Sequence, residues 1–169
     1  DVSVFTQRVA FEDATRNMNI VHDLFENPLE NSDVLVLESG AATILSGGQS
    51  RTFENRVRKG RFESGVDVTG EFAPTILTIS FPQPVVGFGG DWFFALTGDG
   101  LTFTIETGSV TGVFQLSDSL DGNGTGFWGV LSQKPFRSVQ ITGTWPVKGT
   151  SEQFSLDDLI FVLSESDLS

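Results

Sequence analysis

The chain has 169 residues, of which 38% are hydrophobic, so it is large enough for about one domain with a hydrophobic core. Ten Lys and Arg residues against 22 Asp and Glu residues give a formal net charge of −12. This charge disfavours binding to nucleic acid or to an anionic membrane surface, because both require a positive field. The absence of cysteine excludes disulfides and thiolate chemistry, and no apolar run approaches the roughly 20 residues that span a bilayer.

The first predicted element is a short helix between Thr6 and Met18. Thr6 is a suitable N-cap, and Phe5 can pack against Ala10 across that cap. The residues at helical spacing are Val9, Ala10, Ala14 and Met18. We expect this helix to lie on a β-sandwich formed by the rest of the chain.

The chain from about residue 34 to its end is predicted to be mostly β-strand. Short runs rich in Val, Ile, Phe and Thr are separated by glycine-bearing turns, at a spacing typical of antiparallel sandwiches. The predicted strands are 34–37, 75–81, 85–88, 92–96, 101–106, 110–116, 126–131, 138–144 and 154–163. Alternation within 75–81 places Leu77, Ile79 and Phe81 on one face. We therefore predict one all-β domain over residues 1–169, an antiparallel β-sandwich of jelly-roll type with one short N-terminal helix.

Basic residues are concentrated between residues 46 and 65. This segment contains Arg51, Arg56, Arg58, Lys59 and Arg61, half of all the basic residues in the chain. The segment is either a local anion-binding patch or, as we favour, a solvated hairpin or loop whose charge is balanced by Glu54 and Glu63.

Two adjacent carboxylates, Asp157 and Asp158, interrupt the apolar run of the last predicted strand. Strict alternation places Asp157 on one face with Leu159 and Phe161, and Asp158 on the other face. One carboxylate would therefore be buried. A buried ionised carboxylate needs a cation, an arginine or several hydrogen-bond donors.

A structural calcium ion is one solution, because calcium accepts about six to eight oxygen ligands. We expect Glu26, near the first strand, to share such an ion with Asp157 or Asp158 near the last strand. In the competing interpretation, Asp157 or Asp158 accepts hydrogen bonds from turn amides or pairs with Arg8 or Arg137.

Three other patterns each allow a functional interpretation and a purely structural one. Residues 118–124 are predicted to be an acidic turn rather than a calcium loop. His22, which adjoins Asp23, is predicted to be a surface or capping histidine rather than a catalytic one. The glycines of residues 87–91 are predicted to permit close strand approach or a bulge rather than to bind phosphate.

The three tryptophans are candidates for stacking on sugar rings. Trp92 and Trp128 lie in runs dense in Phe and Gly, where core packing is at least as common an outcome. Trp145 precedes Pro146 near the end of a predicted strand, which makes it the best candidate for exposure.

Several segments also carry a resemblance to known domains. They are residues 5–11 with 23–26, residues 77–92, and residues 126–130, 135–139 and 154–161. Together they resemble secreted bacterial β-sandwich domains, notably those of PEP-CTERM-type surface proteins. Leu-Asp-Asp-Leu-Ile-Phe at 156–161 is also similar to the last strand of calcium-stabilised jelly-roll carbohydrate-binding modules. The resemblance implies a secreted or cell-surface location and favours Asp157 over Asp158 as the calcium ligand.

We expect a non-catalytic extracellular domain that binds carbohydrate or a matrix polymer and holds a structural calcium ion. One alternative is a structural or adhesive surface protein that self-associates. A second alternative is a polysaccharide hydrolase or lyase on a jelly-roll scaffold, although the sequence offers no defensible catalytic residue. We expect neither nucleic acid as a partner nor insertion into a membrane.

Overall fold

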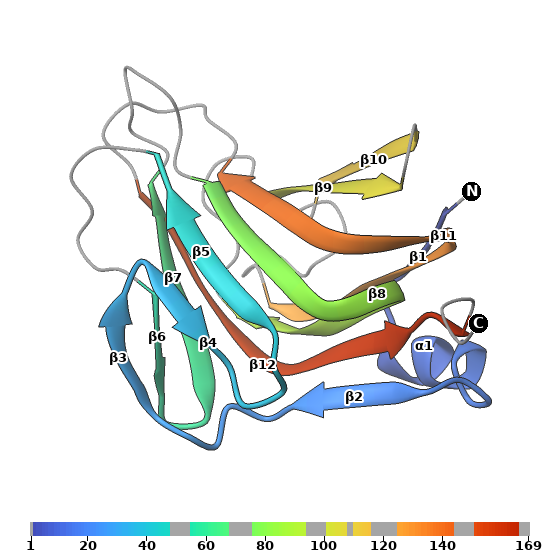
Figure 1. Cartoon of the computed structure of the whole chain (residues 1–169), viewed down its shortest axis with the longest axis horizontal. Helices are drawn as coiled ribbons and strands as arrows, with labels where there is room; N and C mark the ends of the chain where they lie inside the picture. The colour runs from blue at the N-terminus through green and yellow to red at the C-terminus, as the bar shows by residue number, and fades with distance from the viewer. Residues whose placement is uncertain are drawn as a thin grey trace.

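The computed structural model describes residues 2–47, 55–67, 76–93, 101–107, 110–115, 125–143 and 151–165. Within these residues it contains one helix and twelve strands, and the strands that pair are antiparallel (Figure 1). The elements in chain order are β1 (Val2–Phe5), α1 (Arg8–Ala14), β2 (Ile20–Asp23), β3 (Leu29–Ser32), β4 (Val34–Val36), β5 (Ala42–Ser46), β6 (Asn55–Arg58), β7 (Arg61–Asp67), β8 (Ile76–Phe93), β9 (Leu101–Thr107), β10 (Val110–Gln115), β11 (Gly126–Gly143) and β12 (Ser151–Leu163). The all-β antiparallel prediction is confirmed, and the jelly-roll topology stays a prediction.

Two long strands, β8 and β11, organise the sheet. Each has 18 residues, and they pair with each other from Gly126 to Thr142 of β11. The ladder between them is interrupted around residues 82–84 and 132–135, where both strands bend (Figure 1). The two halves of this ribbon therefore belong to different layers of a sandwich.

The remaining strands pair with one half or the other of this bent ribbon, and each therefore belongs to one of the two layers. The first layer has the order β10-β9-β11-β8-β5-β4. The second layer runs β1-β11-β8-β12, and the other edge of β12 pairs first with β7 and then with β2. Beyond β7 lie β6 and β3.

The prediction of separate strands on either side of the prolines is wrong. Residues 75–81, 85–88 and 92–96 were expected as three strands, but residues 76–93 form the single strand β8, and β11 likewise joins 126–131 to 138–144. Proline lacks the N–H that a ladder requires, and it is tolerated here because it falls where the ladder is interrupted.

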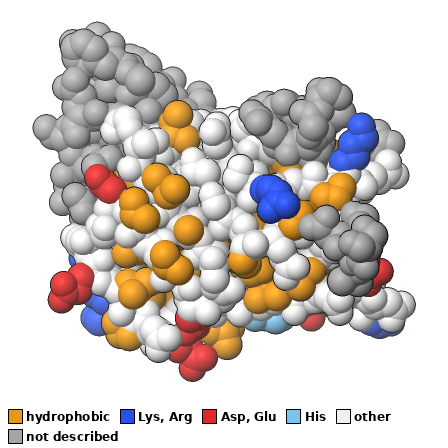
Figure 2. All heavy atoms as spheres, viewed as in Figure 1, with side chains coloured by type: hydrophobic (Ala, Val, Ile, Leu, Met, Phe, Trp, Pro, Cys, Tyr) orange, Lys and Arg blue, Asp and Glu red, His pale blue; other side chains and the backbone are white. Residues whose placement is uncertain are grey.

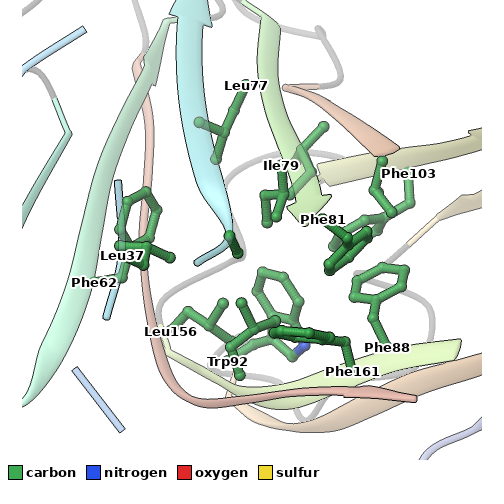
Figure 3. Close-up of a cluster of buried hydrophobic side chains, with 14 of the residues drawn as sticks. Leu37, Phe62, Leu77, Ile79, Phe81, Phe88, Trp92, Phe103, Leu156 and Phe161 are labelled. Carbon is green, nitrogen blue, oxygen red and sulfur yellow. The ribbon is translucent and has the colours of Figure 1, made fainter. Parts of the chain in front are cut away.

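The space between the layers is filled by aromatic and aliphatic side chains (Figure 3). Leu77, Ile79 and Phe81 of β8 are all buried, as their alternation predicts. Phe88 and Phe161 pack against Phe81, with ring centroids 6.2 and 5.2 Å from it. This apolar burial drives the closure of the two layers.

Helix α1 is shorter than predicted and buries a different face. Gln7 occupies the N-cap position and makes no side-chain capping bond, so the predicted Thr6 cap is wrong. Val9 is 71% exposed, whereas Phe11 is completely buried. The helix ends at Ala14, after which the Thr15 hydroxyl donates a hydrogen bond to the carbonyl oxygen of Phe11 (2.9 Å).

Phe11 attaches α1 to the outer face of the second layer. Its ring lies over Gly129 of β11, where an added Cβ would come within 3.0 Å of the ring. Phe5 meets Phe11 edge to face at 5.6 Å, in place of the predicted contact with Ala10. Phe11, Phe127, Ile160 and Val162 form a second buried cluster, separate from the main core. The helix therefore closes one outer face of the sandwich.

The basic segment forms part of the hairpin β6–β7. Its turn consists of Lys59 and Gly60, both at positive φ (56° and 76°). Arg56 donates a hydrogen bond from Nε to the Glu63 carboxylate at 2.7 Å. A hairpin is confirmed for residues 55–65 of the segment, where Glu63 balances Arg56, and the anion-binding alternative stays a prediction. Arg51 and Glu54 lie outside the described residues. The only described helix, α1, is far too short to cross a membrane, and no other described segment forms a membrane-spanning helix.

Candidate functional site

Strand β12 contains a bulge at the two adjacent carboxylates. Asp157 lies opposite Asp91 of β8, but Ile160 lies opposite Gly89, so β12 has one extra residue between these pairs. Asp158 is at φ 51°, in the left-handed region that few non-glycine residues occupy. A bulge of this kind redirects the side chains that follow it.

The bulge removes the conflict that strict alternation predicted. Leu156 and Leu159, three residues apart, both join the main core, together with Phe161. Ile160 and Val162 point to the opposite face, where α1 covers them. The strict alternation predicted for this strand is therefore wrong, since Leu156 lies in the core with Leu159 while Asp158 faces the helix side with Ile160. Both carboxylates are half-buried instead of one being fully buried.

Glycine at position 90 makes room for the bulge. A Cβ added there would lie 2.6 Å from Leu156 Cδ1 and 3.1 Å from the carbonyl oxygen of Asp158. At Gly87 an added Cβ would meet Leu131 Cδ2 at 2.4 Å. The prediction that these glycines permit close approach is confirmed.

Asp158 belongs to a cluster of four charged or titratable side chains, here named the Arg8 cluster: Arg8, His22, Asp91 and Asp158. Arg8 donates from Nη1 to Asp158 Oδ2 at 3.0 Å and from Nη2 to Asp91 Oδ2 at 2.8 Å. His22 Nδ1 lies 2.7 Å from Asp158 Oδ1. The guanidinium carbon of Arg8 lies 5.1 Å from the ring centre of Phe127. The cluster thus joins α1, β2, β8 and β12 at the bulge.

The charge of Arg8 is stabilised within this cluster. Burial lowers the pKa of its guanidinium, but the hydrogen bond to Asp91 and the negative charges of Asp91 and Asp158 raise it by more, so the pKa lies above its ordinary value. Arg8 therefore remains cationic and supplies the positive partner that a half-buried carboxylate requires. The alternative that Asp158 pairs with Arg8 is confirmed.

The structure describes the surroundings of two of the predicted calcium ligands, Asp158 and Glu26. Both oxygens of Asp158 are engaged, one by Arg8 and one by His22. Glu26 is exposed, and its backbone N–H donates to Glu38 Oε1 at 3.1 Å. Among the described residues, no three acidic or imidazole side chains are grouped so that they could hold a metal ion. Asp158 does not fit a calcium site in this arrangement, and calcium binding elsewhere in the chain stays a prediction.

The completely buried carboxylate beside β12 belongs to Asp23, which sequence reasoning considered only as a neighbour of His22. Asp23 is 0% exposed. Its oxygens accept hydrogen bonds from the backbone N–H groups of Phe25 and Ser39, each at 3.0 Å. The only local signal for this role is the Asx turn, in which aspartate accepts from the amide two residues later.

A cleft of about 500 Å³ opens beside the Arg8 cluster. Glu12, Arg16, Ile20 and His22 contribute to its walls. Arg16 pairs with Asp13, and Glu12 lies 3.8 Å from Arg8. These two pairs lie within the helix and the turn that follows it, whereas the pairs of Arg8 with Asp91 and Asp158 fasten the helix to the sheet. His22, 49% exposed, is the surface histidine that the sequence favours, although its partner is Asp158 rather than Asp23.

The tryptophan prediction requires correction at two positions. Trp92 and Trp128 are each 0% exposed and lie in the main core. The Trp92 indole N–H donates to the carbonyl oxygen of Trp128 at 3.2 Å, and Phe103 stacks on Trp128 with ring centroids 4.7 Å apart. Neither indole can offer a face to a sugar at the surface. Trp145 and residues 118–124 lie outside the described residues.

The outer face of the first layer has a different character. Two rows of side chains cross β5, β8, β11 and β9: Ile44, Thr78, Gln140 and Thr104 in one, and Ser46, Ile76, Thr142 and Thr102 in the other. We call these two rows the uncharged face. The residues that alternate with them, such as Leu77 and Ile141, are buried in the core, so the two rows point outward.

Exposed valines extend this surface onto the edge strand β4. Val34 and Val36 are 54% and 67% exposed, and Ile44 opposite Val34 is 40% exposed. Figure 2 shows hydrophobic side chains scattered over the near face, acidic side chains mostly toward its left and lower edges, and Lys or Arg side chains nearer its middle and right. Two neighbouring rows without a charged side chain are unusual on a chain whose net charge is −12.

These features define an antiparallel β-sandwich in which a helix covers one outer face and, among the described residues, two rows without charged side chains cross the other. A scan against protein-family models and a search of curated proteins found no match to this chain. The resemblance to PEP-CTERM-type domains and to carbohydrate-binding modules stays a prediction.

Proposed function

We propose that this protein is a non-catalytic domain that binds a neutral carbohydrate or matrix polymer on the uncharged face. One observation carries the proposal: two outward rows of Thr, Ser, Gln and Ile cross four strands without a charged side chain. Neutral sugars present hydroxyl groups beside apolar C–H surface. Hydroxyl and amide side chains next to Ile44 and Ile76 match both kinds of surface.

The spacing of the sheet supports an extended ligand. Neighbouring strands lie about 4.8 Å apart, so each row offers one side chain per strand across β5, β8, β11 and β9. Because Thr78 and Thr104 are half-buried and restrained at χ1 by β-branching, they lose little side-chain entropy on binding. A polymer of this kind lies outside cells, and we accordingly propose a secreted or cell-surface location.

Binding to neutral polysaccharides tests the proposal. Affinity gels and pull-down with cellulose, xylan and dextran should reveal at least one ligand, and its binding should be insensitive to salt because no charge pair is involved. Thr78→Val and Gln140→Ala should each weaken binding about two- to tenfold, the effect of one lost hydrogen bond. Gln133→Ala, an exposed glutamine on the same strand outside both rows, is the matched control.

Two results would contradict the proposal. One is the absence of binding to every neutral polymer in the panel, and the other is an equal loss of affinity in Gln133→Ala and Gln140→Ala. Release of reducing ends in the same incubations would instead support the hydrolase alternative.

A self-associating surface protein is the second candidate, favoured by the exposed Val34, Val36 and Ile44 beside the edge strand β4. Apolar side chains at a sheet edge promote pairing with another copy. Light scattering across a concentration series tests this candidate, since Val36→Lys should abolish any association that depends on β4.

A further inference from the structure

The tip of the hairpin β6–β7 carries three cationic side chains. Arg58 lies directly opposite Arg61 in the ladder, and Lys59 is in the turn between them. Arg61 is held with its guanidinium carbon 3.9 Å from the ring centre of Phe93. Among the described residues, none forms an ion pair with Arg58 or Lys59. Two of the three charges at the tip therefore face solvent.

This arrangement is unfavourable for the stability of the hairpin. Like charges directly opposite in a sheet repel each other. Lys59 occupies a left-handed position at φ 56°, where a two-residue turn favours Asn or Asp followed by Gly. Neither the like-charge pair nor Lys59 in the turn therefore stabilises the hairpin.

A groove adjoins the basic tip. It lies between β3 and β6, has a volume of about 650 Å³, and is lined by Pro28, Leu29, Glu30, Asn31, Arg56 and Arg58. Arg56 is paired with Glu63 and forms a fixed wall, while the side chain of Arg58 is exposed. Glu30 is the one acidic side chain of this lining. The groove has the size of a site for one or a few sugar rings.

We propose that this groove and the hairpin tip bind an acidic sugar unit of a polysaccharide, through its carboxylate or sulfate group. The anion accepts hydrogen bonds from Arg58 and Lys59, Asn31 offers an amide to sugar hydroxyls, and Pro28 with Leu29 offers apolar surface. This site is separate from the uncharged face. The overall charge of −12 opposes a long polyanion such as nucleic acid, so attraction is confined to the tip.

The test measures binding of fluorescein-labelled oligogalacturonate and of short dextran sulfate oligosaccharides, with unmodified dextran oligosaccharides of the same length as the neutral reference. Arg58→Gln with Lys59→Asn removes two charges while placing Asn at a left-handed position that suits it. The matched control is Arg16→Gln with Lys134→Gln, which removes the same charge from exposed positions elsewhere. We expect the hairpin variant to bind the acidic ligands at least tenfold more weakly, the control to change less than twofold, and added salt to weaken wild-type binding.

Three outcomes would overturn the proposal: no binding of either acidic ligand at low salt, an equal loss in both double variants, or a hairpin variant that alters only self-association in light scattering. Retained dextran binding by the hairpin variant separates this site from the uncharged face, because Thr78→Val and Gln140→Ala act only on the latter. Circular dichroism melting of both double variants verifies that they are folded.

Discussion

The two outer faces of the sandwich differ in what packs on them and in the side chains that they carry. The second layer is covered by α1, whose Phe11 rests on Gly129 and whose Arg8 neutralises Asp91 and Asp158. No described helix covers the first layer, and its central rows carry hydroxyl, amide and aliphatic groups. The comparison indicates that side chains on the covered face stabilise the fold, whereas the rows on the other face are the surface on which we propose that the ligand binds.

The largest effect is expected at Phe11, which anchors the covered face. Phe11→Ala removes a completely buried ring and should lower the free energy of unfolding by about 3–5 kcal/mol. Urea denaturation measures this loss. Val9→Ala on the same helix, at a residue that is 71% exposed, should change stability by less than about 0.5 kcal/mol. Equal losses in the two variants would show that α1 does not close the face through Phe11.

The next effect is expected at Arg8. Arg8→Gln leaves two half-buried carboxylates without their cation and should cost about 1–2 kcal/mol, less than for a fully buried pair because Arg8 is 29% exposed. Arg16→Gln removes an exposed guanidinium paired with Asp13 and should cost less than about 0.5 kcal/mol. The same denaturation series compares them, and a loss in Arg8→Gln no greater than in Arg16→Gln would contradict the role of the cluster.

The variant Asp158→Asn tests whether Asp158 stabilises the fold through Arg8 or through the predicted calcium ion. Asparagine tolerates the left-handed backbone, so the variant removes charge without adding strain. We expect a loss of about 1 kcal/mol that is the same in EDTA and in millimolar calcium, since Arg8 and His22 engage both oxygens. A loss seen only in calcium would show that Asp158 binds the ion, because a ligand held by the folded state raises the melting temperature.

The smallest effect on stability is expected on the open face. Thr78→Val keeps the shape of a half-buried side chain and the β-branching that suits a strand, so unfolding should change by less than about 0.5 kcal/mol. Thermal melting measures this, alongside the polysaccharide binding that the same variant should weaken. A large loss of stability would place Thr78 among the residues that hold the fold.

Local patterns in the sequence predict features of the fold that depend only on which face of a single strand is buried in the core. The alternation of Leu77, Ile79 and Phe81 is such a case. The bulge at Asp158 could not be predicted from a local pattern, because it requires Gly90 of another strand to lie beside it. Helical spacing misplaced the buried face of α1 because this seven-residue helix buries a single side chain, Phe11, in an apolar cluster formed by distant strands.

The candidate sites depended even more on strand order. Thr78, Gln140 and Thr104 are far apart in the sequence, and they form a row only because β8, β11 and β9 are neighbours. Asp23 was missed since one of its two amide donors, Ser39, comes from a turn 16 residues away. The basic segment was visible as a cluster, but the groove beside it requires β3 to pair with β6.

The ribbon of β8 and β11 has a mechanical consequence. Strands β8 and β11 each run through both layers of the sandwich. A force applied to one layer is therefore transmitted to the other through the covalent backbone. Neither half can melt by itself without exposing the core that both layers bury. Tryptophan emission, to which the buried Trp92 and Trp128 contribute, and hydrogen exchange of β9 amides should therefore report one cooperative transition.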